Sequence, residues 1–258
     1  MKYARIAIND EVHWGAVDGD AVEVLAGTPY ERAVGTGRVE ALEHVRLLAP
    51  VAPSKIFCLG RNYAEHVAEM GYQPLEGPSV FMKGSTTVIG PGEPVVLPPQ
   101  SMDPVIEHEA ELAIVIGRPA RFVAAADAAE VILGYACADD VSARTLQRGD
   151  PHPTRGKGFD TFCPVGPWID TQVDPIAGTS IRCSVNGELR QDASTAQMIH
   201  GIPELIEYLS GFATLLPGDL ILTGSPGGSG PLAPGDRVEI EIGGIGTLVH
   251  GVLASDRP

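Results

Sequence analysis

Two glutamates, Glu109 and Glu111, stand two positions apart in IEHEAELAIVIG, a segment whose other residues are mostly apolar. Side chains on a strand alternate between its two faces, so both carboxylates would point the same way. Two like charges on an apolar background are unfavourable unless a cation or a proton compensates them, and a divalent metal ion is the natural compensator. The alternative is a solvent-exposed edge strand whose acids face water.

A third acid, Asp140, follows the apolar run 134–138 and begins the polar stretch DDVSARTLQ. At the end of a buried strand, its carboxylate can converge with those of Glu109 and Glu111. Three carboxylates leave about half of an octahedral shell open to water and substrate oxygens, which suits Mg²⁺ or Mn²⁺ better than zinc. The alternative is a helix N-cap, with the Asp140 side chain accepting a hydrogen bond from a backbone N–H two or three residues later.

His66 and Glu69 lie three positions apart in segment 62–70, whose pattern predicts a short helix that ends at Gly71 as its C-cap. Residues at this spacing share a helix face, so the carboxylate can orient the imidazole. The pair would then serve as a general base that acts on water. The same spacing is also typical of a solvated helix face.

Four further residues could bind an anionic substrate. Arg144 and Gln147 follow Asp140, and an arginine can hold a carboxylate with two parallel hydrogen bonds. Lys157 stands between glycines in GKGFDTF, where it could neutralise a developing enolate or oxyanion. Thr223 ends an apolar strand at the glycine-rich loop LTGSPGGSGP and could offer its hydroxyl. The alternative for the charged residues is ordinary surface charge.

The elements that must position these residues are mostly short strands. Residues 1–50 predict a small N-terminal β domain, and the stretch LLAPVAPS links it to a catalytic domain at 51–258. The elements expected in the second domain are a strand at 56–59, a helix at 127–133, a strand at 134–138, a type I′ hairpin turn at Asn186-Gly187, a helix at 202–209, and strands that begin after the turns at 217–219 and 234–236. The proline-rich passage 91–104 is expected to lack regular structure. This pattern predicts a β-rich α+β fold.

Composition limits the classes of function. The chain has 258 residues, 44% of them hydrophobic, and a formal net charge of −15. Such a surface repels nucleic acids and acidic membranes, whereas a small anionic substrate could bind in a local pocket of cations. The sequence shows neither a membrane-spanning run nor a signal peptide, so we expect a soluble cytoplasmic protein. The four cysteines lack disulfide or zinc-site spacing and are expected to be buried and reduced.

Seven segments together resemble the fumarylacetoacetate hydrolase family, from about Lys55 to the C-terminus. In order they are GRNYAEHVAEMG, VFMKGST, HEAELAIVIG, DDVSARTLQ, KGFDTFCPVGP, VNGELRQ and LLPGDLILTGSPGGSGP. The resemblance implies a mixed β-roll, usually a homodimer, that binds Mg²⁺ or Mn²⁺. Carried over to this sequence, it implies Glu109, Glu111 and Asp140 as metal ligands, His66, Glu69 and Lys157 as catalytic residues, and Arg144, Gln147 and Thr223 as substrate-binding residues.

One position departs from part of that family. The longer members that hydrolyse fumarylacetoacetate carry an aspartate ligand where this sequence has Asn62, so the chain resembles the short members. These imply an enzyme that acts on a small 2-oxo (di)carboxylic acid through a metal-stabilised enolate. The reaction would be that of an acylpyruvate hydrolase, an oxaloacetate decarboxylase or a 2-hydroxyhepta-2,4-diene-1,7-dioate isomerase, and the sequence does not choose among them. The alternatives are a 2-oxo-4-enoate hydratase and a catalytically silent protein that binds metal and 2-oxo acids.

Overall fold

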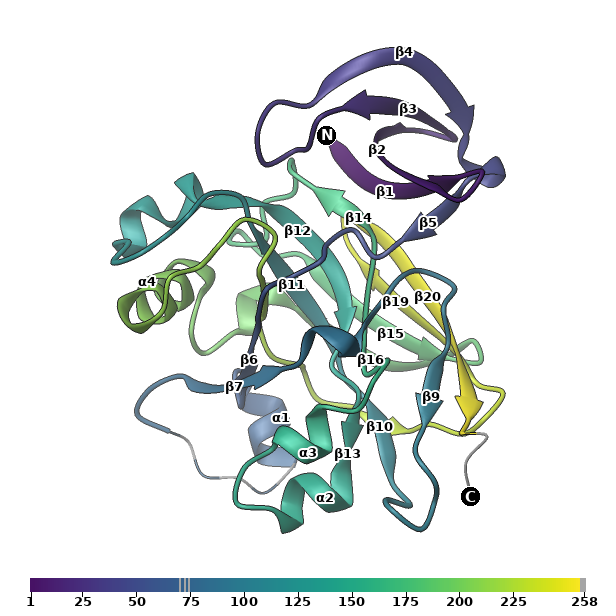
Figure 1. Ribbon diagram of the computed structural model, residues 1–258. Helices are drawn as coiled ribbons and strands as arrows, with labels where there is room; N and C mark the ends of the chain where they lie inside the picture. The colour runs from purple at the N-terminus through teal and green to yellow at the C-terminus, as the bar shows by residue number, and fades with distance from the viewer. Residues whose placement is uncertain (70, 72, 74, 256–258) are drawn as a thin grey trace.

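A computed structural model describes residues 1–69, 71, 73 and 75–255, and strands dominate it (Figure 1). The strands are β1 (Lys2–Ile8), β2 (Glu11–Asp18), β3 (Ala21–Ala26), β4 (Val34–Ala41), β5 (Arg46–Leu48), β6 (Ile56–Gly60), β7 (Ser79–Lys83), β8 (Val88–Ile89), β9 (Val95–Leu97), β10 (Ile106–His108), β11 (Ala110–Ile116), β12 (Ile132–Asp139), β13 (Ser142–Ala143), β14 (Cys163–Asp170), β15 (Ser180–Val185), β16 (Glu188–Ser194), β17 (Leu220–Leu222), β18 (Gly230–Pro231), β19 (Arg237–Ile242) and β20 (Gly246–Ala254). The α-helices are α1 (Ala64–Glu69), α2 (Arg144–Gly149), α3 (Thr154–Lys157) and α4 (Ile202–Phe212), and the 3₁₀ turns are η1 (Leu42–His44), η2 (Ser85–Thr87), η3 (Ala125–Glu130) and η4 (Thr195–Gln197).

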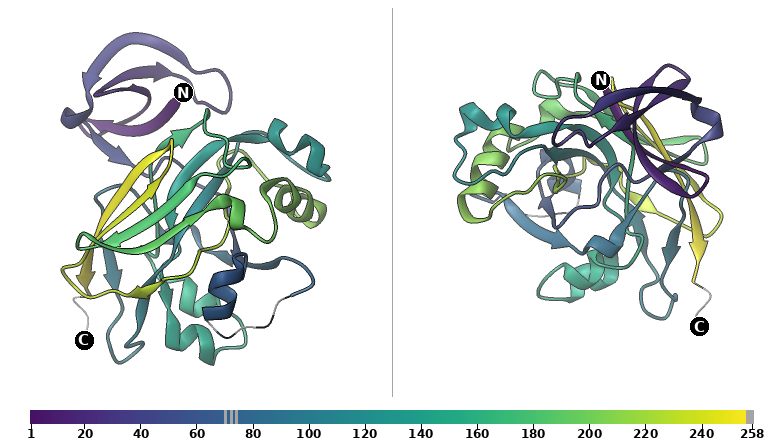
Figure 2. Two further views of the ribbon diagram at one scale, coloured as in Figure 1. Left: turned by 180° about the vertical axis from the view of Figure 1, so that it is seen from behind. Right: turned by 45° about the horizontal axis from the view of Figure 1, so that its top comes forward.

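In the described residues these strands form three sheets, of which the two larger mix parallel and antiparallel pairs and the smallest is antiparallel. The largest has twelve strands in the order β4-β3-β2-β1-β14-β12-β11-β17-β6-β7, with β5 and β8 attached to β1 and β14. A five-stranded sheet, β16-β15-β19-β20-β9, lies alongside it (Figure 2). A third sheet joins β13, β10 and β18. The β-rich α+β fold expected from the sequence is therefore confirmed. In the described part of the chain, no helix is long and apolar enough to cross a membrane.

The N-terminal strands form a meander with a small core of its own. Ala4, Ile6, Val22 and Val24 are buried together there, as the alternation of apolar residues predicts. Strand β1 pairs with β2 on one side and with β14 on the other, so the meander continues the largest sheet. Figure 1 shows these strands, in purple, above the rest of the molecule.

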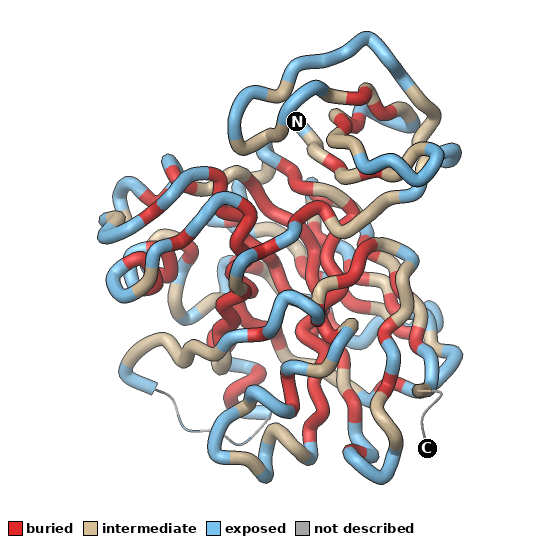
Figure 3. The backbone as a smooth tube through the Cα atoms, in the orientation of Figure 1, coloured by how far each residue is buried: buried red, intermediate tan, exposed pale blue. Residues whose placement is uncertain are grey.

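Strand β11 lies in the middle of the largest sheet, between β12 and β17. Its side chains are buried on both faces. Leu112, Ile114 and Ile116 belong to the core shared with the five-stranded sheet and α4, whereas Ala113 and Val115 pack into a second core on the opposite face. Figure 3 shows this centre as continuous red tube. Glu111 therefore projects from a fully buried strand, and Glu109 is the residue immediately before that strand.

Most of the other predicted elements are present. Helix α4 buries Ile202, Leu205, Ile206 and Leu209, as their spacing predicts. The turn between β15 and β16 has positive φ at Asn186 (54°) and at Gly187 (80°), as a type I′ turn requires. The four cysteines are free and buried.

Two expectations about local structure were wrong. The helix expected at 127–133 is instead the 3₁₀ turn η3 followed by the start of β12, because two N–H groups of the chain after β11 donate to the carbonyl of Val131 and draw it toward the sheet. The passage 91–104 was expected to lack regular structure, yet it contains β9. Strand β9 pairs in parallel with β20, and the burial of Val95 and Leu97 favours that pairing.

Candidate active site

Three acids converge at the junction of β11 and β12. Glu109 precedes β11, Glu111 lies within it, and Asp140 follows β12. The antiparallel pairing of the two strands brings the acids together, and the N–H of Asp140 donates to the carbonyl of Glu109 at 2.9 Å. One oxygen from each carboxylate lies within 4.8 Å of the others, and all three residues are buried. The structure therefore brings the three predicted acids to one point, and their role as metal ligands stays a prediction.

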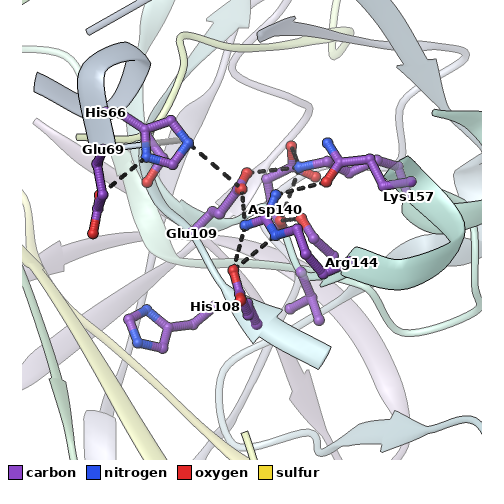
Figure 4. Close-up of polar contacts among 12 residues, drawn as sticks. His66, Glu69, His108, Glu109, Asp140, Arg144 and Lys157 are labelled. Atoms are coloured by element: carbon purple, nitrogen blue, oxygen red, sulfur yellow. Dashed lines mark hydrogen bonds and ion pairs between the residues drawn. The ribbon is translucent and has the colours of Figure 1, made fainter. Parts of the chain in front are cut away.

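Three cations lie beside these acids, and Figure 4 shows two of them, Arg144 and Lys157. Lys157 Nζ lies 2.6 Å from both Glu109 Oε2 and Asp140 Oδ2. Lys83 Nζ lies 2.6 Å from Asp140 Oδ1. Arg144 Nη2 lies 2.6 Å from Glu109 Oε1. Asp140 is therefore not a helix N-cap. The three cations are buried beside the acids and do not lie on a solvated surface.

Charge is nevertheless not balanced in this cluster. Its carboxylates are Glu107, Glu109, Glu111 and Asp140, whereas its cations are Lys83, Arg144 and Lys157, so one negative charge is left over. Burial tends to raise the pKa of Glu109, but Lys157 and Arg144 hold it well below its usual range. Burial raises the pKa of Glu111 well above its usual range, and the charges of Asp140 and Glu109 raise it further. Among the described residues, Glu111 is therefore the acid of this cluster that has no ion pair with a cation.

The donor set fits a hard divalent ion. All three candidate ligands are carboxylate oxygens, which Mg²⁺ and Mn²⁺ prefer to the nitrogen and sulfur ligands typical of zinc. Such an ion would also supply the positive charge that Glu111 lacks. The oxygen of Glu111 that faces the loop after β17 accepts a hydrogen bond from the N–H of Gly224 at 2.6 Å, which fixes the orientation of the carboxylate.

His66 and Glu69 share a face of helix α1, as their spacing predicts (Figure 4). His66 is buried, and its Nδ1 lies 3.6 Å from Glu69 Oε2 while its Nε2 lies 4.0 Å from Glu109 Oε1. Among the described residues, Nδ1 has no hydrogen-bond partner. Glu69 Oε2 accepts a hydrogen bond from the N–H of Gly228 at 2.9 Å. The imidazole therefore lies between two carboxylates without being fixed by either.

Arg144 is fully engaged with neighbouring side chains. Its Nε donates to Glu107 Oε2 at 2.7 Å, its Nη1 donates to Gln147 Oε1 at 2.6 Å, and its Nη2 bonds Glu109. Burial opposes the charge of this guanidinium, but Glu109 and Glu107 outweigh burial and raise its pKa. In this arrangement Arg144 orients a candidate metal ligand, and its predicted contact with a substrate carboxylate stays a prediction.

Thr223 occupies a different position from the other predicted residues. Its hydroxyl donates to the carbonyl of Leu112 at 2.9 Å, and its own carbonyl accepts from the Asn62 side chain at 2.7 Å. Asn62 also donates to the carbonyl of His200 at 3.1 Å. Thr223 thus ties β17 to β11 and does not line the cavity next to the acids, so its predicted substrate contact has no support from these hydrogen bonds.

A cavity of about 440 Å³ opens on the acids, which is large enough for a small organic acid. Its wall contains seven of the predicted residues, namely His66, Glu109, Glu111, Asp140, Arg144, Gln147 and Lys157. It also contains residues to which the sequence assigned no role, among them Arg61, Ser79, Phe81, Arg148 and Ser225.

Two further sets of contacts support the site and were missed from the sequence. The first is the contact of Lys83 with Asp140. The motif VFMKGST, which contains Lys83, contributes to the family resemblance, but the sequence assigned this lysine no role. A lysine in an otherwise apolar strand was the signal that could have found it. The second is a buried pair, His250 and Asp139, whose Nε2 and Oδ2 atoms lie 2.9 Å apart. Asp139 Oδ1 in turn accepts from the N–H of Glu109 at 2.8 Å. No local pattern could join residues so distant in sequence.

Comparison with known families gives two matches along the chain. Residues 55–253 match the family model described as fumarylacetoacetate (FAA) hydrolase C-terminal, and residues 1–50 match the model described as Rv2993c-like, N-terminal. Among curated relatives, protein Rv2993c of Mycobacterium tuberculosis is 47% identical over 267 residues, which cover 100% of both chains. The mitochondrial oxaloacetate tautomerase FAHD2B of Bos taurus is 41% identical over 222 residues, which cover 81% of this chain and 70% of the tautomerase.

Solved structures agree with this assignment. A 2-hydroxyhepta-2,4-diene-1,7-dioate isomerase from Mycobacterium marinum has a TM-score of 0.92 and 44% identity, with 100% of both chains covered. A maleylpyruvate hydrolase from Sphingobium sp. SYK-6, solved in complex with manganese(II) and pyruvate, has a TM-score of 0.83 and 33% identity, with 99% of this chain and 100% of that chain covered. The agreement in fold extends over essentially the whole chain.

Proposed function

Because this chain belongs to the fumarylacetoacetate hydrolase family, whose members include a tautomerase, an isomerase and a hydrolase, we propose that it catalyses a metal-dependent proton transfer on a small 2-oxo dicarboxylic acid. The proton moved is the one on the carbon next to the 2-oxo group, so the reaction is a tautomerisation or an isomerisation. One observation carries this proposal: three buried carboxylates and an unfixed, buried histidine line the same cavity.

Glu109, Glu111 and Asp140 would hold Mg²⁺ or Mn²⁺. Such an ion, when bound, acts as a Lewis acid that stabilises negative charge on a substrate oxygen. The choice of these metals follows from the oxygen donors and is supported by the relative solved with manganese(II) and pyruvate. Lys157 keeps its positive charge, because Asp140 and Glu109 outweigh the effect of burial and raise its pKa. It therefore adds a fixed cation to the wall of the same cavity.

His66 is the residue proposed to move the proton. Its Nδ1 is 3.6 Å from Glu69 Oε2, so a small approach would let Nδ1–H donate to that carboxylate and leave Nε2 as the basic nitrogen. Catalytic hydrogen bonds are often long before substrate binds and tighten in the complex. His66 would then accept the proton from the substrate carbon and return it at the position that the product requires.

Tautomerisation and isomerisation are favoured by similarity. The oxaloacetate tautomerase is 41% identical to this chain and the diene-dioate isomerase structure is 44% identical, whereas the maleylpyruvate hydrolase is 33% identical. C–C bond hydrolysis of an acylpyruvate is the second candidate, because a histidine beside a carboxylate can also activate water. Decarboxylation of oxaloacetate would require the same enolate-stabilising site.

The test is an assay of chelator-stripped protein reconstituted with Mg²⁺ or Mn²⁺. We expect acceleration of the enol-to-keto conversion of oxaloacetate, or isomerisation of 2-hydroxyhepta-2,4-diene-1,7-dioate, which ultraviolet absorbance follows. Acetylpyruvate and maleylpyruvate serve as hydrolysis substrates, and pyruvate release from oxaloacetate reports decarboxylation. Hydrolysis without proton-transfer activity would favour the second candidate. Hydration of a 2-oxo-4-enoate would indicate a hydratase, and oxalate binding without any turnover would indicate a silent binding protein.

A further inference from the structure

We propose that Arg148 binds the second carboxylate of a dicarboxylic substrate, and this inference rests on the proposed function. A substrate held by the metal through its 2-oxo acid end needs a cation elsewhere in the cavity if it carries a second carboxylate. The sequence predicted Arg144 and Gln147 for a carboxylate of the substrate. In the structure a different arginine, Arg148, is placed to bind the second carboxylate.

Arg144 has no free donor pair for a second anion in this arrangement. Its Nε and Nη2 bond the carboxylates of Glu107 and Glu109, and its Nη1 bonds Gln147. Two carboxylates thus already neutralise this guanidinium. Releasing it would leave Glu109 with less compensating charge in a buried site, which is costly.

Arg148 lies four positions after Arg144 on helix α2, and residues at this spacing share a helix face. Both arginines line the same cavity. Unlike Arg144, Arg148 is exposed, and within the described residues its guanidinium has no hydrogen bond or ion pair. An unpaired arginine in the wall of a substrate cavity can bind a carboxylate through two parallel hydrogen bonds.

The acid nearest to Arg148 in the sequence does not neutralise it. Asp150 also lines the cavity, but its carboxylate is bound by Arg155, whose Nε lies 2.7 Å from Asp150 Oδ2 and whose Nη2 lies 2.5 Å from Oδ1. The positive charge of Arg148 therefore stays available in a chain whose formal net charge is −15. A single uncompensated cation at this position selects for a dicarboxylate over a monocarboxylate.

The experiment measures how Arg148→Gln changes discrimination between one and two carboxylates. For oxaloacetate, we expect KM to rise at least about tenfold while kcat changes less than about twofold. The competitive inhibition constant of pyruvate, which has one carboxylate, should stay within about twofold of the wild-type value. Arg148→Lys should recover part of the loss, because lysine keeps the charge but not the two-pronged geometry.

The matched control is Arg118→Gln, which removes the same charge from another exposed arginine; its guanidinium has no partner among the described residues, and it lies outside the cavity wall. It should leave both constants unchanged. An unchanged KM for oxaloacetate in Arg148→Gln, or equal losses for oxaloacetate and pyruvate, would overturn the proposal. If the wild type turns over no 2-oxo acid, the proposed function fails instead. In that case calorimetry of the Mg²⁺-loaded proteins tests the role of Arg148. Arg148→Gln should bind oxaloacetate at least about tenfold more weakly than the wild type does, and pyruvate within about twofold of the wild-type affinity.

Discussion

The carboxylate cluster and helix α1 face the same cavity, but the protein holds them in different ways. Glu109, Glu111 and Asp140 lie within or next to buried strands, and lysine, arginine and a backbone N–H contact them at 2.6 Å. The histidine of α1 lies 3.6 and 4.0 Å from its two carboxylates, and its Nδ1 has no hydrogen-bond partner in the part of the chain that the structure describes. The first region is therefore held by close contacts, whereas the imidazole in the second region is not fixed by its neighbours.

This difference assigns separate tasks to the two regions. A rigid acidic cluster suits the binding of an ion at a fixed point, because the repulsion among its acids is built into the fold. A loosely held histidine suits a step that begins only after substrate has entered. Variants in the two regions should therefore separate metal binding from turnover.

Glu109→Ala is expected to have the largest effect. It removes a candidate metal ligand and leaves Lys157 and Arg144 without their shared partner, so metal content should fall to background and turnover by at least about three orders of magnitude. Elemental analysis of purified protein and the tautomerisation assay measure the two losses. Glu188→Ala, which changes an exposed acid, is the matched control and should match the wild type. Full activity of Glu109→Ala after chelator treatment would refute the metal requirement.

His66→Ala should give the next largest effect, and on turnover alone. We expect kcat to fall by about two to four orders of magnitude while the metal content stays at the wild-type level, because His66 is not among the three clustered acids. Parallel measurements of kcat and bound metal test this separation. An unchanged kcat would show that His66 has only a structural role. Loss of the bound ion would show that His66 also contributes to metal binding.

The neighbours Asp139 and Asp140 differ in another way, because only one of them lines the cavity. Asp140 faces the cavity, whereas Asp139 is fully buried against His250. His250→Leu should lower the free energy of unfolding by about 1–3 kcal/mol, because it leaves the Asp139 carboxylate with an unsatisfied oxygen. The midpoint of urea unfolding measures this loss, and His44→Leu, at an exposed histidine, is the control. Identical midpoints would show that the buried pair contributes nothing to stability.

Glu69→Gln should have the smallest effect. Glu69 is partly exposed and lies 3.6 Å from His66, so we expect kcat to fall only about tenfold, the lower end for a residue that orients another. Steady-state rates at saturating substrate measure it. A loss as large as that of His66→Ala would mean that the pair is already tightly coupled before substrate binds.

Local patterns in the sequence predicted the elements that carry the site. Alternation along the segment IEHEAELAIVIG predicted that Glu109 and Glu111 lie together, although Glu109 itself stands just before β11, and helical spacing predicted that His66 lies beside Glu69. These predictions succeeded because each depends on neighbours in sequence. Helix α4 and the Asn186-Gly187 turn were predicted for the same reason.

The rest depends on contacts between distant segments. Lys83 reaches Asp140 across 57 positions and His250 reaches Asp139 across 111, so no local pattern could pair them. The engagement of Arg144 by Glu107 and Glu109 likewise follows from the packing of α2 against the strands. The 3₁₀ turn before β12 was mistaken for a helix because tertiary hydrogen bonds, rather than local propensity, end it.

Direct titration of the chelator-stripped protein with Mn²⁺, followed by the electron paramagnetic resonance signal of the free ion, tests the central claim most directly. The wild type should bind about one ion per chain at a hard-oxygen site. Glu111→Gln should bind none in the same range and stay folded, because Glu111 is the acid of the cluster that has no ion pair with a cation among the described residues. Equal Mn²⁺ binding by the wild type and a folded Glu111→Gln, or no binding by the wild type, would contradict the claim that these three carboxylates form a metal site.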